Sequence, residues 1–258
     1  MSSILASINN KGGVGKTTTT VNLAAALAKQ GKSVLVIDFD PQSNTTKKLL
    51  PSDVRIKNSI FDILNSDGII DPIDFIYPTE AKGCSIIPNI SQTANLEPGL
   101  IRNFPDSLLI LRKTLRDFCK DNFDYTLIDC PPNMGTFVLL ALHASDKALI
   151  PIDPGSLDSV DGFDNITSLL HDIKKSSNKD LNGMKILINR LDKRTGLGVV
   201  MVDRIRATFK DKVLDTIVPI NTAIQKSEAL KENVFKHFPS STSANAFRKL
   251  AKEIIAEF

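Results

Sequence analysis

The sequence contains little cysteine, no long uncharged apolar run and almost no net charge. Its three cysteines, Cys84, Cys119 and Cys130, are widely spaced and form no C-x-x-C pair, which argues against a disulfide framework or zinc site and predicts reduced thiols. No uncharged stretch is long enough to cross a bilayer, and no basic region followed by an apolar run opens the sequence. We therefore expect a soluble, cytoplasmic protein.

The formal net charge of +3 says little about binding partners, but the charge is unevenly distributed. The stretch from Arg190 to Lys212 holds seven basic and three acidic residues, which leaves the rest of the chain close to neutral. Such a stretch either binds nucleic-acid phosphates or forms a solvated surface. No aromatic interleaving accompanies the basic residues, so we expect no readout of base sequence.

Short apolar runs alternate with longer amphipathic ones along the 258 residues. Runs rich in Ile, Leu and Val predict parallel strands covered on both faces, at residues 4–8, 33–38, 85–88, 125–129, 148–152, 185–189 and 213–218. Helical spacing of apolar residues predicts helices at about residues 16–29, 107–120, 134–145, 157–175, 197–209, 222–231 and 242–257. This order predicts one α/β domain over residues 1–258, with a mostly parallel twisted sheet, helices on both faces and ligands at the carboxyl ends of the strands. Residues 41–105 are less regular, and we expect loops and short helices there.

The stretch NNKGGVGKTTTT at residues 9–20 nearly matches the phosphate-binding motif G-x-x-x-x-G-K-[ST], with Asn10 in place of the first glycine. It follows a predicted strand and opens a predicted helix, which is the context that the motif requires. Backbone N–H groups of such a loop bind phosphate oxygens, and the helix N-terminus adds its positive dipole end. In this motif Lys16 binds the β- and γ-phosphates and Thr17 ligates Mg²⁺, so the sequence predicts a P-loop NTPase-like fold.

Acidic residues end two other predicted strands. Asp38 and Asp40, in VLVIDFDPQ, share a side of an extended chain, where an acid can hold the water shell of a metal or orient an attacking water. Asp129 ends the strand YTLID and suits a Mg²⁺-bound water. Each acid alone could equally be a helix cap or a turn residue, but together with the loop they indicate one site.

Three motifs in this order, KGGVGKTT, VIDFDPQ and LIDCPPN, resemble those of the ParA/MinD family of deviant Walker A ATPases. The resemblance covers nearly the whole chain. Its later segments, INRLDKRTGLG, FKDKVLDTIVP and SANAFRKLAKEI, favour the short ParA-type DNA-partition ATPases. The resemblance implies a Mg²⁺-dependent ATP hydrolase that forms a sandwich dimer when ATP is bound.

The resemblance also implies a role for the second lysine of the loop. Lys11 would reach across the dimer interface to the phosphates of the partner's ATP, as an arginine finger does, while Asp40 would position the attacking water and Asp38 would support Mg²⁺. The expected catalytic residues are thus Lys11, Lys16 and Asp40, and the expected metal ligands are Thr17, Asp38 and Asp129. The expected nucleotide-binding residues are Lys11, Gly12, Gly13, Val14, Gly15, Lys16, Thr17, Thr18, Asn189 and Pro219. The last two match places where relatives hold adenine, although an asparagine at a strand end is as often a turn former.

Members of this family use the ATP dimer to hold a surface, either nonspecific DNA or, through a C-terminal amphipathic helix, a membrane. The predicted last helix has an apolar face that includes Phe247, Leu250, Ile254 and Phe258, but its polar face mixes basic and acidic residues. A membrane helix needs a basic polar face. We therefore expect this helix to pack on the sheet, and we expect no membrane binding.

Nonspecific DNA is the expected surface. The candidate DNA-binding residues are Arg190, Lys193, Arg194, Arg204, Arg206 and Lys226. Many relatives carry basic residues directly after the proline, whereas residues 220–225 are neutral here, so the DNA surface could be shifted or weakened. A solvated basic face stays open as the alternative.

The sequence thus predicts a ParA-like ATPase for plasmid or chromosome partition. Its ATP-bound homodimer would bind nucleoid DNA, and a ParB-like adaptor would release it by stimulating hydrolysis. A MinD-like membrane-surface ATPase is one alternative. A nucleotide-gated DNA-coating scaffold with incidental hydrolysis is the other.

Overall fold

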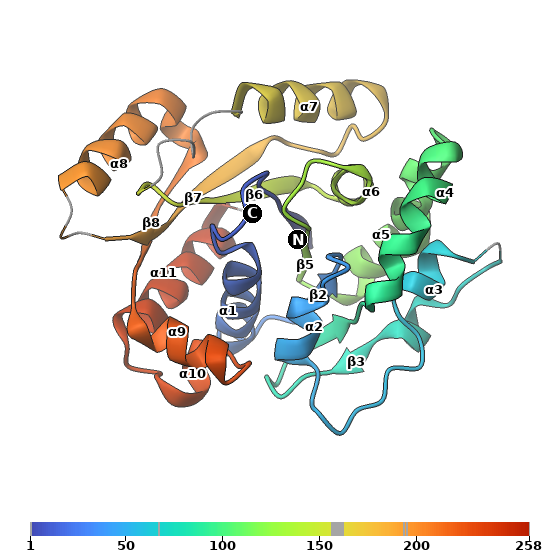
Figure 1. The fold of residues 1–258 in the computed structure, drawn as a ribbon, viewed down its shortest axis with the longest axis horizontal. Coiled ribbons are helices and arrows are strands. Elements are labelled where there is room, and N and C mark those ends of the chain that lie inside the picture. The colour runs from blue at the N-terminus through green and yellow to red at the C-terminus, as the bar shows by residue number, and fades with distance from the viewer. Residues whose placement is uncertain (1, 67, 156–162, 193, 195, 258) are drawn as a thin grey trace.

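The computed structural model describes residues 2–66, 68–155, 163–192, 194 and 196–257. Within them one eight-stranded sheet has the order β3-β4-β2-β5-β1-β6-β7-β8, as Figure 1 shows in part. The strands are β1 Ser3–Ser7, β2 Val34–Asp38, β3 Tyr77–Pro78, β4 Cys84–Ile87, β5 Tyr125–Asp129, β6 Lys147–Ile152, β7 Met184–Leu191 and β8 Val213–Pro219. All seven predicted strands are present and parallel, so the predicted α/β class is confirmed.

The helices also follow the predicted order. They are α1 Lys16–Lys29, α2 Asn44–Leu49, α3 Ile60–Leu64, α4 Glu97–Arg102, α5 Ile110–Asn122, α6 Thr136–Ala144, α7 Phe163–Ser176, α8 Gly196–Phe209, α9 Thr222–Ala229, α10 Val234–His237 and α11 Thr242–Glu257. Residues 157–162 of the predicted helix 157–175 lie outside the described residues. The irregular segment 41–105 contains three short helices, as expected, but also the short edge strand β3, which pairs antiparallel with β4.

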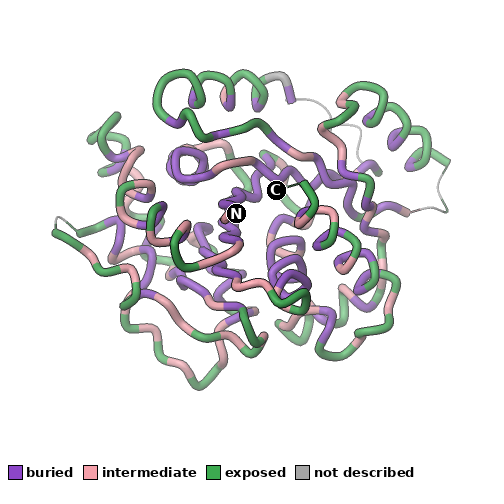
Figure 2. The backbone as a smooth tube through the Cα atoms, turned by 180° about the vertical axis from the view of Figure 1, so that it is seen from behind, coloured by how far each residue is buried: buried purple, intermediate pink, exposed green. Residues whose placement is uncertain are grey.

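The apolar strands separate two hydrophobic cores, one on each face of the sheet. Leu35 and Ile37 of β2 pack into the core that α5, α6 and α7 cover. Val34 and Val36 alternate with them and pack into the core that α1, α10 and α11 cover. Figure 2 shows the result, with the strands and α1 buried and the outer surfaces of the peripheral helices exposed. A strand covered on both faces needs apolar residues at successive positions, which explains why the runs lack polar alternation.

The last helix packs as the sequence predicted. Phe247, Leu250 and Ile254 are fully buried, and α11 lies beside α1 on one face of the sheet (Figure 1). Phe258 lies outside the described residues. Among the residues that the structure describes, no helix is both long enough and apolar enough to span a membrane.

Strand register brings the predicted functional segments to one edge of the sheet. Ser7, the last residue of β1, pairs with Asp129 of β5, and Asp129 in turn pairs with Asp38 of β2. The phosphate loop therefore leaves the sheet directly beside Asp129, and Asp38 lies one strand further along the same edge. This is the carboxyl edge of the parallel strands, where open α/β sheets bind their ligands.

Candidate functional site

The loop between β1 and α1 has the backbone of a phosphate cradle. Gly13 and Gly15 have φ values of +77° and +89°, a left-handed region that favours glycine. Asn9 fixes the start of the loop, because its side-chain amide donates to the carbonyl oxygen of Pro151 (2.8 Å) while its Oδ1 accepts from the backbone N–H of Lys11 (2.9 Å). Gly15 directly precedes α1, so the helix N-terminus faces the loop.

Lys16 lies at the centre of this cradle and is 7% exposed. Its ammonium donates to the carbonyl oxygens of Asn9 and Lys11, both at 3.1 Å. Burial lowers the pKa of Lys16, and the nearby negative charge of Asp129 opposes that shift. The two carbonyl acceptors of this buried ammonium are neutral, so Lys16 is suited to bind an anion, and phosphate oxygens would add negative charge beside it.

Asp129 is fully buried at the end of β5 and accepts hydrogen bonds from several threonines. Its Oδ2 accepts from the hydroxyls of Thr17 (2.7 Å) and Thr45 (2.6 Å), and its Oδ1 accepts from Thr20 (3.2 Å). Burial raises its pKa, and the hydrogen bonds from Thr45 and Thr17 oppose that rise. The predicted metal residues Thr17 and Asp129 are therefore in direct contact.

Asp38 is buried beside Asp129, and α2 holds it. Its Oδ2 accepts from the backbone N–H and the hydroxyl of Thr46, both at 2.7 Å. Burial, and next the negative charge of Asp129, raise the pKa of Asp38 to about 7. Asp40 lies two residues on, is 8% exposed and donates its backbone N–H to Oδ1 of Asp38 (3.3 Å).

This group of residues fits Mg²⁺. Thr17, Asp38 and Asp129 offer only hard oxygen donors, and the two buried carboxylates repel each other in a way that a divalent cation would relieve. No group of three His, Cys, Asp or Glu side chains among the described residues has metal-site geometry. Mg²⁺ binds by few carboxylates with phosphate oxygens and waters, so a small donor set is appropriate.

A cavity of about 480 Å³ opens over the loop. The residues that line it include Gly12, Gly13, Gly15, Lys16, Thr17, Thr18, Asp40, Lys48, Arg190 and Glu228. A second cavity of about 40 Å³ shares Gly15, Thr18, Arg190 and Glu228 with the first and is also lined by Asn189 and Pro219. The predicted nucleotide-binding residues therefore line two adjoining cavities, except for Lys11 and the buried Val14, which line neither.

Asn189 has a defined structural position as well. Its side-chain amide donates to the carbonyl oxygen of Val14 (2.8 Å), and both residues are buried. A Cβ on Gly15 would lie 2.3 Å from the same amide nitrogen. Asn189 thus packs against the phosphate loop itself, which the sequence did not indicate.

Lys11 and the flanking glycines lie at the rim of the site. Lys11 is half-buried and is not among the residues lining the 480 Å³ cavity, whereas Gly12 and Gly13 are exposed. A Cβ built on Gly12 or Gly13 meets no atom within 4 Å in the single chain. The space above these two glycines is open, as an approach by another molecule requires.

Sequence reasoning missed four residues of the site. Thr45 and Thr46 of α2 hold Asp129 and Asp38, Glu228 of α9 accepts a short hydrogen bond from Thr18, and Lys48 lies 3.6 Å from Glu228. Glu228 is 210 residues from Thr18 in the chain, so no local spacing could reveal the contact. The threonines follow VIDFDPQ closely, and their proximity to two acids was a signal that could have been used.

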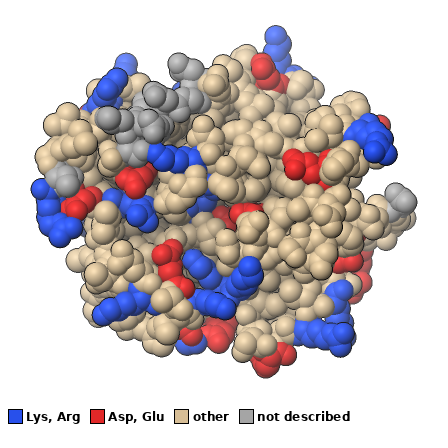
Figure 3. Space-filling model, viewed as in Figure 1, with Lys and Arg blue, Asp and Glu red and all other residues tan. Residues whose placement is uncertain are grey.

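The candidate DNA-binding residues are dispersed rather than gathered. Arg190 lines both cavities and pairs with Asp153 (3.2 Å), and Arg194 pairs with Asp192 (2.7 Å). Arg204 and Arg206 lie exposed on α8, Lys226 lies exposed on α9, and Lys193 is outside the described residues. Figure 3 shows the basic and acidic side chains of the described residues interspersed over this face.

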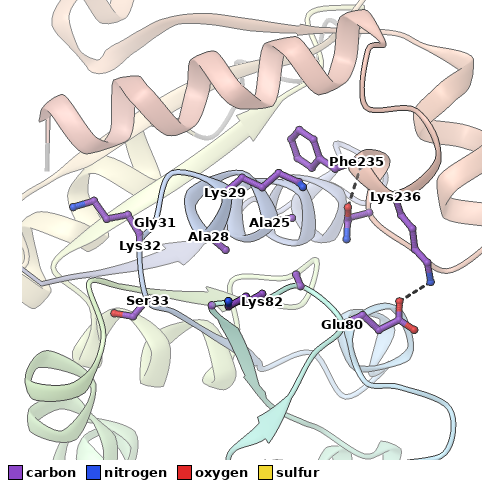
Figure 4. Close-up of a pocket in the computed structure, with 13 residues that line it drawn as sticks. Ala25, Ala28, Lys29, Gly31, Lys32, Ser33, Glu80, Lys82, Phe235 and Lys236 are labelled. Atoms are coloured by element: carbon purple, nitrogen blue, oxygen red, sulfur yellow. Dashed lines mark hydrogen bonds and ion pairs between the residues drawn. The ribbon is translucent and has the colours of Figure 1, made fainter.

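A larger cavity, of about 690 Å³, lies at the other end of α1. Figure 4 shows Lys29, Lys32, Lys82, Glu80 and Lys236 around it, with the Glu80–Lys236 ion pair at one side. Neither the phosphate loop nor any of the three acids lines it. This cavity is larger than the one over the phosphate loop, but its lining holds none of the predicted phosphate-binding or metal-binding residues.

Comparisons with known proteins agree with the geometry. The AAA_31 family model, an AAA domain, matches residues 2–183. The sporulation initiation inhibitor protein Soj of Bacillus subtilis (strain 168) is 35% identical over 99% of both chains, and the chromosome-partitioning ATPase Soj of Thermus thermophilus is 32% identical over 98% of this chain and 95% of its own. The structure of cobyrinic acid a,c-diamide synthase from Mycobacterium smegmatis, with an ATP analogue and magnesium, superposes with a TM-score of 0.82 at 26% identity, covering 99% of this chain and 95% of that one.

The family match covers more than half of the chain, and the relatives align over almost its full length. The phosphate loop, Lys16, Asp38 and Asp129 lie together at the carboxyl edge of the sheet. The chain belongs to the AAA_31 family and is a P-loop ATP hydrolase of the ParA/MinD type.

Proposed function

We propose that this protein is a partition ATPase, one catalytic domain over residues 1–258, whose ATP-bound dimer binds nonspecific DNA. The observation that carries the proposal is the loop itself, in which a second lysine, Lys11, lies at an open rim beside the buried Lys16. The similarity over nearly the full length to the chromosome-partitioning ATPase Soj of Thermus thermophilus supports partition of DNA as the role. The partner would be a ParB-like adaptor and the location the cytoplasm, on the nucleoid.

The two adjoining cavities suggest how ATP is held. Backbone N–H groups of residues 12–17 and the ammonium of Lys16 would bind the phosphates, and Asn189 and Pro219 would border the base. Thr17, with Asp129 and Asp38 behind it, would hold Mg²⁺, which neutralises charge on the phosphates when it is bound. Thr17 would exchange its present hydrogen bond to Asp129 for the metal.

Dimerisation would depend on ATP through Lys11. Two loops facing each other through Gly12 and Gly13 could approach closely, because both glycines are exposed and a Cβ built on either of them meets no described atom within 4 Å. Each Lys11 ammonium would then approach the phosphates of the partner's ATP. Without the γ-phosphate, the negative charge that attracts each Lys11 across the interface would be smaller, so the dimer would open.

Asp40 is the candidate for positioning the attacking water. It lines the phosphate cavity, and its Oδ1 accepts from the backbone N–H of Gln42 (2.9 Å), which fixes its orientation. Contact with the adaptor would accelerate hydrolysis by ordering groups that are already present.

Binding of random-sequence duplex DNA without nucleotide, with ADP and with ATP–Mg²⁺, at two salt concentrations, tests the proposal. We expect binding only with ATP–Mg²⁺, and weaker binding at the higher salt concentration, because each phosphate contact releases counterions. Binding that is equal in all three states would contradict a link between dimer closure and DNA. Absence of binding in every state, with ATP-dependent flotation on anionic liposomes, would instead favour a membrane-surface ATPase.

A charge-reversal variant locates the DNA surface. Arg204 and Arg206 are exposed on α8, away from the phosphate cavity, so R204E/R206E should retain ATP hydrolysis and lose DNA affinity. Lys249 and Lys252 are exposed on α11, so K249E/K252E is a matched control that reverses the same number of charges. Unchanged DNA binding by R204E/R206E would remove α8 from the DNA surface.

A further inference from the structure

Lys48 of α2 lies beside Glu228, a residue that lines both cavities of the proposed nucleotide site. Its ammonium is 3.6 Å from Oε1 of Glu228, and the same oxygen accepts the hydroxyl of Thr18. Three segments that are far apart in sequence, α1, α2 and α9, therefore meet at one carboxylate. Glu228 and Thr18 line both cavities, and Lys48 lines the one over the phosphate loop.

The negative charge of Glu228, which lines both cavities, would oppose phosphate binding unless a nearby cation offset it. A nucleotide that spans the two cavities brings its phosphates close to Glu228, whose negative charge would repel them. Lys48 is positioned to offset that charge. Its side chain is only 16% exposed, so solvent screens it less than it screens a surface lysine.

We propose that Lys48 is a further nucleotide-binding residue, which exchanges Glu228 for a phosphate oxygen when the nucleotide binds. The exchange requires only a local movement of the ammonium, because the lysine already faces the cavity that contains Lys16. Glu228 would then accept a hydrogen bond from a hydroxyl group of the ligand or from that of Thr18.

The same exchange links the nucleotide to the metal site. Lys48 belongs to the helix whose Thr45 and Thr46 bind Asp129 and Asp38. A phosphate bound by Lys48 would therefore contact the same six-residue helix whose threonines bind both acids. This proposal rests on the placement of ATP in this site under the proposed function.

Calorimetric titration of Mg²⁺–ADP and of a non-hydrolysable Mg²⁺–ATP analogue tests the proposal. A charge-assisted contact to phosphate predicts that K48A weakens both affinities by about tenfold or more. Lys47 is the matched control, because it lies on the same helix, is exposed, and donates to the carbonyl oxygen of Gln42 (2.7 Å) rather than facing the loop. K47A should bind within about twofold of the unaltered protein.

A second comparison separates phosphate binding from simple neutralisation of Glu228. If Lys48 contacts phosphate, K48A/E228Q stays weaker than E228Q by a similar factor. If the loss disappears in the E228Q background, or if K48A binds normally, the proposal is wrong. K16A separates failure of this proposal from failure of the proposed function. Normal binding by both K48A and K16A would mean that ATP does not occupy this site at all.

Discussion

The three glycines of the phosphate loop should respond very differently to the same substitution by alanine. Gly12 has neither a left-handed φ nor a neighbour within 4 Å of a built Cβ. Gly13 has a φ of +77° with open space around it. Gly15 has a φ of +89° and a built Cβ only 2.3 Å from Nδ2 of Asn189. The series therefore separates backbone strain from steric exclusion.

The magnitudes follow from these geometries. A side chain in the left-handed region costs about 1–2 kcal/mol, which applies to both G13A and G15A. In G15A the added methyl group also displaces Asn189 from its buried hydrogen bond to Val14 (2.8 Å), at a further cost of about 1–3 kcal/mol. We expect free energies of unfolding lowered by less than about 0.5 kcal/mol for G12A, about 1–2 for G13A and about 2–5 for G15A.

Urea unfolding of the nucleotide-free protein, followed by circular dichroism because the chain has no tryptophan, measures the series. N189A removes the group that the new methyl displaces, so G15A/N189A should be less destabilised than the sum of its single variants. Equal stability of G13A and G15A, or strict additivity of G15A with N189A, would refute the packing of Asn189 on the loop.

Three other substitutions probe separate parts of the structure. K11A should bind ATP within about twofold of the unaltered protein, since Lys11 does not line the cavity, but should lose the ATP-dependent dimer in light scattering. D40A should retain that dimer and lose ATP turnover, and undiminished turnover would exclude Asp40 from the chemistry. R116A should lower the free energy of unfolding by about 1.5–3 kcal/mol in a urea titration, because it removes the charge-assisted bond from Arg116 to Asp146 (2.6 Å) while Lys120 still pairs with Asp146 (2.7 Å).

Much of the fold could be predicted because burial on both faces leaves a simple pattern in the sequence. The seven parallel strands are apolar at successive positions, and their order with the helices permits few topologies. The two-residue strand β3 escaped prediction, because Tyr77–Pro78 is too short to show any periodicity. Its pairing with β4 depends on tertiary contact rather than on local preference.

The residues of the candidate site also fall into two groups, those with a local signal in the sequence and those that only folding brings together. Lys16, Thr17 and Asp129 could be predicted because a glycine-rich loop and an acid at a strand end are local signals. Glu228 could not, because only the folding of α9 against α1 brings it to Thr18. The basic stretch from Arg190 to Lys212 indicates a DNA surface less clearly than its count of basic residues suggests, since Asp153 and Asp192 pair with two of its arginines.

One segment of eleven residues connects these observations. Asp38 accepts the backbone N–H groups of Asp40 and Thr46, so the turn between β2 and α2 is fixed at both ends by a single carboxylate. Thr45 of the same helix binds Asp129, and Lys48 ends the segment at the nucleotide cavity. Under the proposed function, a ligand at the metal site and a ligand at the phosphate site would therefore both contact one short element that follows Asp40 directly. This element would offer a short path for coupling between nucleotide state and the geometry of hydrolysis, because both ligands would act on the same helix.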